Sequence, residues 1–144
     1  MRFAVLALAA LLGACAPAPL RPVPELEVSR RFGLVVPDGV LLARGEEGPV
    51  EVTEFRFPPD SPYRPYSLEE LGERLRAQLE ARGFALRCRT YNALPLFGGP
   101  QYTARLARGA EGVGIFLRPL PQPDAYRVEV APADPNPPLG CPAR

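Results

Sequence analysis

The fold is decided by the stretch SLEELGERLRAQLEARGFALRC, residues 67–88. Its leucines recur at helical spacing, and such a stripe must be buried against another layer; the stripe comprises Leu68, Leu71, Leu75 and Leu79. Ser67 is a favourable N-cap, and Glu70 completes a capping box three residues later. Tyr66 can form a hydrophobic staple with Leu71. Because Gly83 stands where a helix C-terminus often takes glycine, we expect one helix over residues 68–82.

A second glycine, Gly72, lies beside the leucine stripe inside this predicted helix. Glycine costs a helix interior about 1 kcal/mol relative to alanine. Its presence therefore predicts that the layer covering the helix approaches the backbone closely at this point.

After Gly83 the apolar period falls to two, which predicts strands at residues 84–91, 102–106, 113–117 and 126–130. Ahead of the helix, residues 40–43 and 50–57 have the pattern of a hairpin. The apolar phase of its second strand changes near Thr53 and Glu54, which predicts a bulge there. The order β-β-α-β-β-β-β predicts an α+β fold, with a mainly antiparallel sheet of about six strands and one helix packed on one face.

The chain begins with features of a secretory signal, because Arg2 precedes a short apolar run and small residues. The segment Leu12-Gly13-Ala14-Cys15 resembles the lipobox of bacterial lipoproteins. The resemblance implies that residues 1–14 are a signal peptide and that Cys15 receives fatty acyl chains as the first residue of the mature protein. The alternative is an ordinary secretory signal in which the cysteine is incidental.

The resemblance also bears on location. In enteric bacteria an aspartate after the lipidated cysteine retains a lipoprotein in the inner membrane, and this chain has Ala16 instead. The resemblance therefore implies, in an organism with two membranes, a protein of the outer membrane that faces the periplasm. In an organism with one membrane it implies a protein on the outer face of the cell membrane.

Four regions are expected along the chain. Residues 1–14 form the signal, and residues 15–31 form the lipidated cysteine with a proline-rich tether. Residues 32–130 form a single α+β domain, and residues 131–144 form a proline-rich tail. From residue 16 to residue 31, polyproline II structure would extend about 50 Å, which predicts a spacer between bilayer and domain.

The chain has three cysteines, and a role can be assigned to each. If Cys15 takes lipid, Cys88 and Cys141 form an even pair in an oxidising compartment, so we expect a disulfide that holds the tail. Cys88 shares its alternation phase with Phe84 and Leu86. This phase predicts that Cys88 lies on the helix-covered face of the sheet or at its edge.

Composition excludes several classes of activity. Without Arg2 the chain has sixteen arginines against sixteen acidic residues, which argues against a generally basic nucleic-acid binder. It has no histidine and no lysine, so a Ser-His-Asp site, a Schiff base and a Walker loop cannot be built. The cysteines and scattered aspartates do not form a metal-ligand pattern. We expect neither a metal nor another cofactor.

Two surfaces are candidates for binding. Alternation predicts a basic outer face that carries Arg87, Arg89, Arg105, Arg118 and Arg127. The lengths of the helix and the following strand predict that two proline-rich loops become neighbours and present Tyr63, Leu94, Leu96 and Phe97 as an apolar edge. The alternatives are an ordinary solvated strand face and a lid that folds back over the core.

The expected function is that of a membrane-anchored, non-enzymatic lipoprotein of the cell envelope, acting in binding or assembly. The domain loosely resembles small α+β accessory envelope lipoproteins, which implies at most such a role and transfers no functional residue. Its partners would be the membrane, through Cys15, and an envelope protein or an anionic glycan. The alternatives are a small carboxylate-dependent enzyme acting on cell-wall glycan, with pairs such as Glu46 and Glu47 or Glu51 and Glu54, and a carrier that holds an apolar ligand between helix and sheet.

Overall fold

A computed structural model describes residues 22–94, 96, 99–137 and 141 of the chain. The elements follow one another as β1 (Glu25–Ser29), β2 (Leu34–Pro37), β3 (Val40–Glu47), β4 (Val50–Arg56), α1 (Leu68–Glu80), β5 (Ala85–Asn92), β6 (Gln101–Arg108), β7 (Glu111–Pro119) and β8 (Ala125–Pro132). β1 and β2 pair with each other, and the other six strands form the main sheet.

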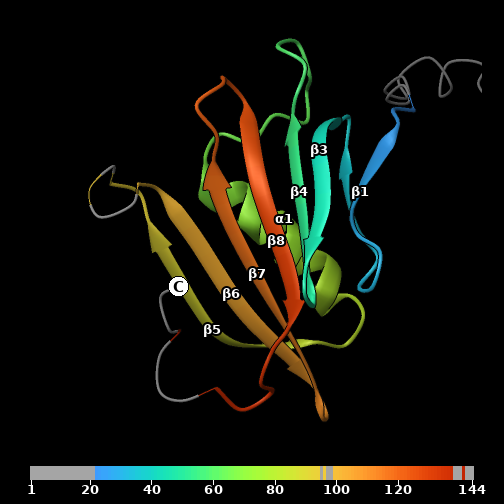
Figure 1. Ribbon diagram of the computed structural model, residues 1–144, viewed down its shortest axis with the longest axis vertical. Helices are drawn as coiled ribbons and strands as arrows, with labels where there is room; N and C mark the ends of the chain where they lie inside the picture. Colours follow the sequence, from blue (N-terminus) through green and yellow to red (C-terminus); the bar gives the residue numbers. More distant parts are fainter. Residues whose placement is uncertain (1–21, 95, 97–98, 138–140, 142–144) are drawn as a thin grey trace, which may run out of the picture.

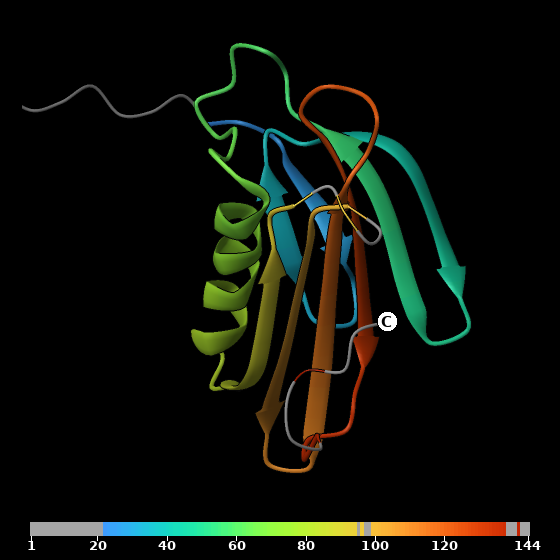
Figure 2. The ribbon, with the colours of Figure 1, turned by 90° about the vertical axis from the view of Figure 1, so that its left-hand side faces the viewer.

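The main sheet is antiparallel and has the strand order β3-β4-β8-β7-β6-β5. Helix α1 covers one face of this sheet, as Figures 1 and 2 show. We call that face the inner face and the opposite one the outer face. The sheet strands and the helix occur along the chain in the predicted order, so the predicted α+β fold is confirmed.

Local signals fix both ends of α1. The Ser67 hydroxyl accepts a hydrogen bond from the Glu70 backbone N–H at 3.1 Å, and the Glu70 carboxylate accepts one from the Tyr66 N–H. At the other end, the N–H groups of Gly83 and Phe84 donate to the carbonyls of Glu80 and Leu79, which is the pairing of a Schellman motif. The predicted staple is not formed, because the Tyr66 side chain is fully exposed and cannot pack on Leu71.

The glycine in α1 permits the close approach that the sequence predicts. A Cβ added at Gly72 would lie 2.5 Å from Cδ1 and Cε1 of Tyr102, whose ring is fully buried on β6. The leucine stripe of the helix packs on the same side of the sheet. The Tyr102 ring of the sheet therefore packs directly against the helix backbone at Gly72.

The strand pair β1–β2 covers the other half of the inner face and was not predicted. Val28, Leu34 and Val36 of this pair are buried in the common core, together with Phe32 from the turn between the strands. Gln78 of α1 binds β2 by accepting from the Val35 N–H and donating to the Val35 carbonyl. Residues 25–31, which the sequence assigns to a tether, thus belong to the folded domain.

The predicted bulge in the hairpin lies on the other strand. β4 pairs with β8 without interruption over residues 51–56, and the register shift occurs in β3 between Leu41 and Ala43. Phe55 faces the core, whereas Val50 and Val52 are largely buried on the outer face. The apolar phase changes along β4 because the strand buries side chains on both of its faces. No bulge is therefore needed to bring the valines and the phenylalanine to the same face.

Candidate binding surfaces

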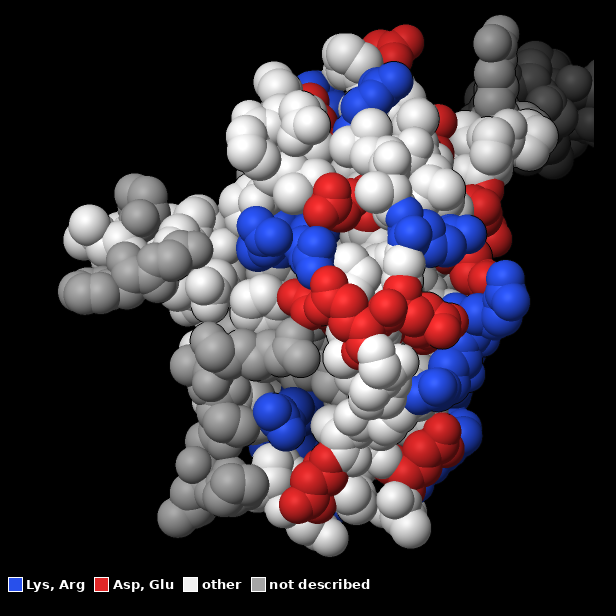
Figure 3. Space-filling model, viewed as in Figure 1, with Lys and Arg blue, Asp and Glu red and all other residues white. Residues whose placement is uncertain are grey.

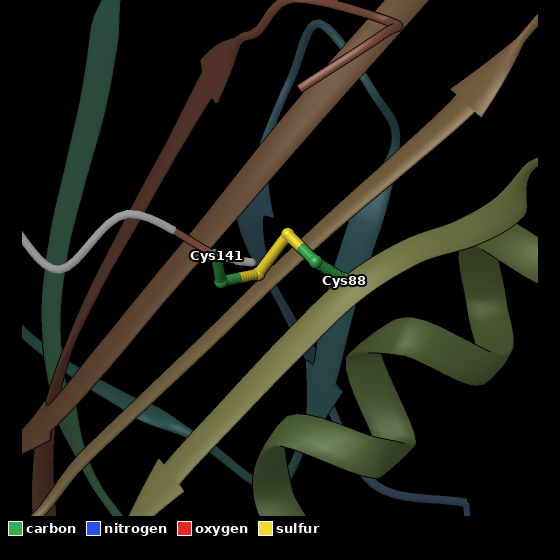
Figure 4. Close-up of a disulfide and its surroundings, with 2 residues drawn as sticks. All are labelled: Cys88 and Cys141. Atoms are coloured by element: carbon green, nitrogen blue, oxygen red, sulfur yellow. A yellow bond between two sulfur atoms is a disulfide. The ribbon is translucent and has the colours of Figure 1, made fainter. Parts of the chain in front are cut away.

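The disulfide joins β5 to the segment after β8. Cys88 and Cys141 are bonded, with their Cα atoms 5.2 Å apart (Figure 4). A bulge between Leu86 and Cys88 shifts the register of β5, so Cys88 pairs with Arg105, while Leu86 pairs with the buried Leu106. Cys88 therefore lies on the outer face of β5, which is the edge strand of the sheet. The predicted position on the helix-covered face is wrong, whereas the alternative, a position at the edge, agrees with the place of β5. One inserted residue inverts the side on which every later residue of the strand projects.

The same bulge divides the predicted basic face. Arg89 pairs with the buried Ala104, so it projects to the inner face, where its guanidinium binds Glu69 and Glu73 of α1. It also lies over the Tyr102 ring, with Cζ 5.6 Å from the ring centroid. Arg89 is thus part of the contact between helix and sheet and does not belong to an outer binding surface. Arg87 is exposed at the bulge itself.

The three other predicted arginines lie on the outer face. Arg105 pairs with Gly114, and Arg118 stands opposite Arg127 on neighbouring strands. Arg127 binds Glu54 at 3.1 Å and Glu47 at 3.3 Å, and Glu129 lies 3.9 Å away. Figure 3 shows the resulting band of acidic side chains across the middle of this face, flanked by arginines. The face is mixed in charge and is not a basic patch.

Burial lowers the pKa of the Arg127 guanidinium, but its hydrogen bond to Glu54 and the charge of Glu129 outweigh burial and raise the pKa net. The positive charge of Arg127 is therefore fixed among its carboxylates. These contacts also bear on the proposed glycosidase, which needs a sugar between two carboxyl groups. Here the guanidinium binds both Glu47 and Glu54, and Glu51 accepts from the Ser29 hydroxyl and the Arg30 backbone N–H.

The predicted apolar edge is divided in a similar way. Tyr63 is half-buried and packs against the core, and its carbonyl accepts a hydrogen bond from Arg74. Leu94 and Leu96 are each 61% exposed on the loop between β5 and β6. Phe97 lies outside the described residues. The structure thus describes two exposed leucines, with the tyrosine turned toward the core.

A groove of about 330 Å³ lies on the outer face, between the sheet and the chain that follows β8. Its floor includes Thr103, Gly114 and Phe116, and its wall includes Ala133 and Asp134. Gly112 allows the wall to stand this close, because an added Cβ there would lie 2.2 Å from the Ala133 carbonyl oxygen. Sequence reasoning missed this groove because it placed Cys88, and with it the tail, on the helix-covered face or at its edge, whereas the chain after β8 crosses the outer face.

The carrier hypothesis requires space between helix and sheet. Leu71, Leu75 and Leu79 are at most 1% exposed and pack within the core. This packing does not favour a ligand held under the helix.

The part of the chain that the structure describes holds no group of three or more histidine, cysteine, aspartate or glutamate residues placed to bind a metal ion. No helix within it has the length and apolar character that crossing a bilayer requires. No protein-family model, curated protein or solved structure matches the chain.

Proposed function

We propose that this chain is a lipid-anchored protein of the cell envelope that acts as a non-enzymatic binding or assembly module. The observation that carries the anchor is the pairing of Cys88 with Cys141. Disulfides persist in oxidising compartments, so the pair supports export. It also leaves Cys15, at the end of the lipobox-like segment, as the remaining cysteine of three, available for acylation.

The binding role is supported by the groove on the outer face. The groove has a volume of about 330 Å³ and is lined by both polar and apolar side chains, a mixture that is also found in protein–protein interfaces. Among the described residues that line it, Arg105 is the only basic side chain, against Glu129 and Asp134. This balance does not favour an anionic glycan, so we propose an envelope protein as the partner.

The anchor is tested by Cys15→Ser. This variant is expected to lose labelling by a clickable fatty acid and to move from the membrane fraction to the soluble fraction of the envelope. Cys88→Ser with Cys141→Ser is the matched control, because it also removes cysteines but should keep the label. Labelling that persists in Cys15→Ser would disprove lipidation at this residue.

The binding surface is tested by a photoreactive benzoylphenylalanine introduced at position 116, in the groove. Crosslinking in intact cells should give one adduct of defined mass. The control carries the same group at position 77, an exposed residue on the opposite side of the molecule. Equal adducts from both positions, or none from position 116, would refute the groove as the binding site.

A further inference from the structure

Six of the seven large apolar side chains that are exposed among the described residues lie at one end of the sheet, and the seventh, Leu86, lies near the start of β5 at the other end. In the antiparallel sheet, β3 begins, β4 ends, β5 ends and β6 begins at the same end, which we call the tether end. In Figure 1 it runs from the start of β3 at the upper right to the end of β5 at the left. Val40, Leu41 and Leu42 at the start of β3 are 37%, 44% and 42% exposed. Leu94 and Leu96 follow the end of β5, and Tyr66 lies on the loop that leads from β4 into α1.

The amino-terminal segment enters the fold at this same end. Glu25 of β1 pairs with Pro37 of β2, and the Pro24 carbonyl accepts a hydrogen bond from the Asp38 N–H at 2.8 Å. Asp38 is two residues before Val40. The chain that comes from Cys15 therefore reaches the domain directly beside the exposed start of β3.

The length of this connection limits where the domain can lie. From Cys15 to Pro24 there are nine residue steps, which can span at most about 32 Å when fully extended. The sequence alone predicts about 50 Å, because it counts residues 25–31 as tether. Since β1 takes those residues into the fold, the domain is held close to any surface that holds Cys15.

We propose that the tether end of the domain contacts the lipid bilayer, with Val40–Leu42, Tyr66, Leu94 and Leu96 as an apolar rim in the interfacial layer. This inference rests on the proposed anchor at Cys15. Tyrosine and leucine side chains favour the boundary between headgroups and acyl chains, and an extended apolar surface adds to the affinity of a single anchor. The bilayer would thus cover apolar side chains that are otherwise exposed to water.

The contact is shallow. The outer edge of β3 has unpaired backbone groups, which lipid headgroups and water can satisfy but hydrocarbon cannot. Arg56, the register partner of Val40, is exposed at the same end and can bind a headgroup phosphate. The opposite end of the sheet, with the β6–β7 turn, lies one strand length away, about 26 Å for eight residues.

The absence of tryptophan from the chain provides a direct test. Tyr66→Trp places a single fluorophore on the rim at a fully exposed position, and Ala110→Trp places one on the exposed β6–β7 turn as the matched control. Each variant is expressed from the complete chain, so that the cell can process and acylate it, and the purified protein is reconstituted into phosphatidylcholine and phosphatidylglycerol vesicles that contain acyl-chain-brominated lipid. We expect quenching of Tyr66→Trp at least three-fold stronger than that of Ala110→Trp, and its reduction when Leu41→Asp is added.

The outcomes separate the rim from the anchor. If the protein floats with the vesicles and both tryptophans are quenched equally weakly, the rim is refuted while the anchor stands. If the protein does not float and carries no acyl chain, the anchor is refuted and the inference falls with it. Strong quenching at position 66 alone supports both.

Discussion

Gly72→Ala is expected to destabilise the protein, although helix propensity taken alone predicts the reverse. Alanine is favoured over glycine in a helix interior by about 1 kcal/mol. The added methyl group, however, would lie 2.5 Å from two ring carbons of Tyr102 and 2.6 Å from a third. Carbon atoms pack at about 3.5–4.0 Å, so the ring or the helix must move by about 1 Å.

Neither partner can move freely. The Tyr102 ring is completely buried, and Arg89 lies over it while binding two glutamates of the same helix. Overpacking of a well-packed core costs about 1–3 kcal/mol, and the rigid ring favours the upper part of that range. After the gain in helix propensity is subtracted, we expect a net loss of about 1–2 kcal/mol in the free energy of unfolding.

Denaturant unfolding of the wild-type protein and four variants separates the two effects. Ala77→Gly, at an exposed position of the same helix, measures propensity alone and should cost about 1 kcal/mol. In a Tyr102→Ala background, Gly72→Ala should change sign and stabilise, because the ring is gone. The reasoning is refuted if Gly72→Ala stabilises the wild-type protein, or if its effect is the same with and without the ring.

Four further predictions concern the disulfide, two titrating groups and the exposed loop. Mass spectrometry of the non-reduced protein should find the Cys88 and Cys141 peptides joined, and two alkylatable thiols in freshly isolated protein would contradict the disulfide. Replacing both cysteines by serine should lower the free energy of unfolding by up to about 4 kcal/mol. The Tyr66 N–H and the Arg74 guanidinium hold the pKa of Glu70 below its usual value. The ionised Glu70 carboxylate therefore stabilises the folded protein above the unfolded-state pKa, and this stabilisation is lost as the pH falls through the folded-state pKa. The deficit in melting temperature of Glu70→Gln should therefore shrink from pH 7 to pH 3, and a constant deficit would argue against it. Burial, aided by Glu73, raises the pKa of Tyr102 to about 12, so stability should fall as the pH rises from about 10 to 12, and alkaline unfolding curves of Tyr102→Phe should lack this part of the loss. Leu94→Asp should shift the free energy of unfolding by less than about 0.5 kcal/mol in thermal melts, because the side chain is mostly exposed, and a drop of several kcal/mol would show that the loop closes over the core.

The sequence predicts well those features that local chemistry controls. The helix follows from its leucine stripe, Ser67 and Gly83, and the sheet strands follow from alternation, because each signal acts within a few residues. The prediction that Gly72 marks a close approach is confirmed by Tyr102. Identifying the contacting residue required the pairing of β6 with its neighbours, which a single sequence does not contain.

The missed elements share a different cause. β1 lies among prolines 22, 24 and 37, and its apolar residues Leu26 and Val28 are too few to stand out from a tether. It becomes a strand through contacts distant in sequence, such as the Thr53 hydroxyl donating to the Val28 carbonyl. Likewise, no turn residue or glycine marks the bulge at Arg87, so alternation alone placed Cys88 and Arg89 on the wrong faces.

That bulge determines more than the position of one cysteine. With Cys88 on the outer face, the tail must pass over β7 to reach it, and it can do so because Gly112 leaves space for the Ala133 carbonyl. Ala133 and Asp134 then form one wall of the outer groove. Ala133 is also held beside β7 by a hydrogen bond from its N–H to the Gly112 carbonyl at 3.0 Å. The inserted residue in β5, the glycine in β7 and the disulfide therefore act together: they stabilise the tail, and they also shape the surface that we propose as the binding site.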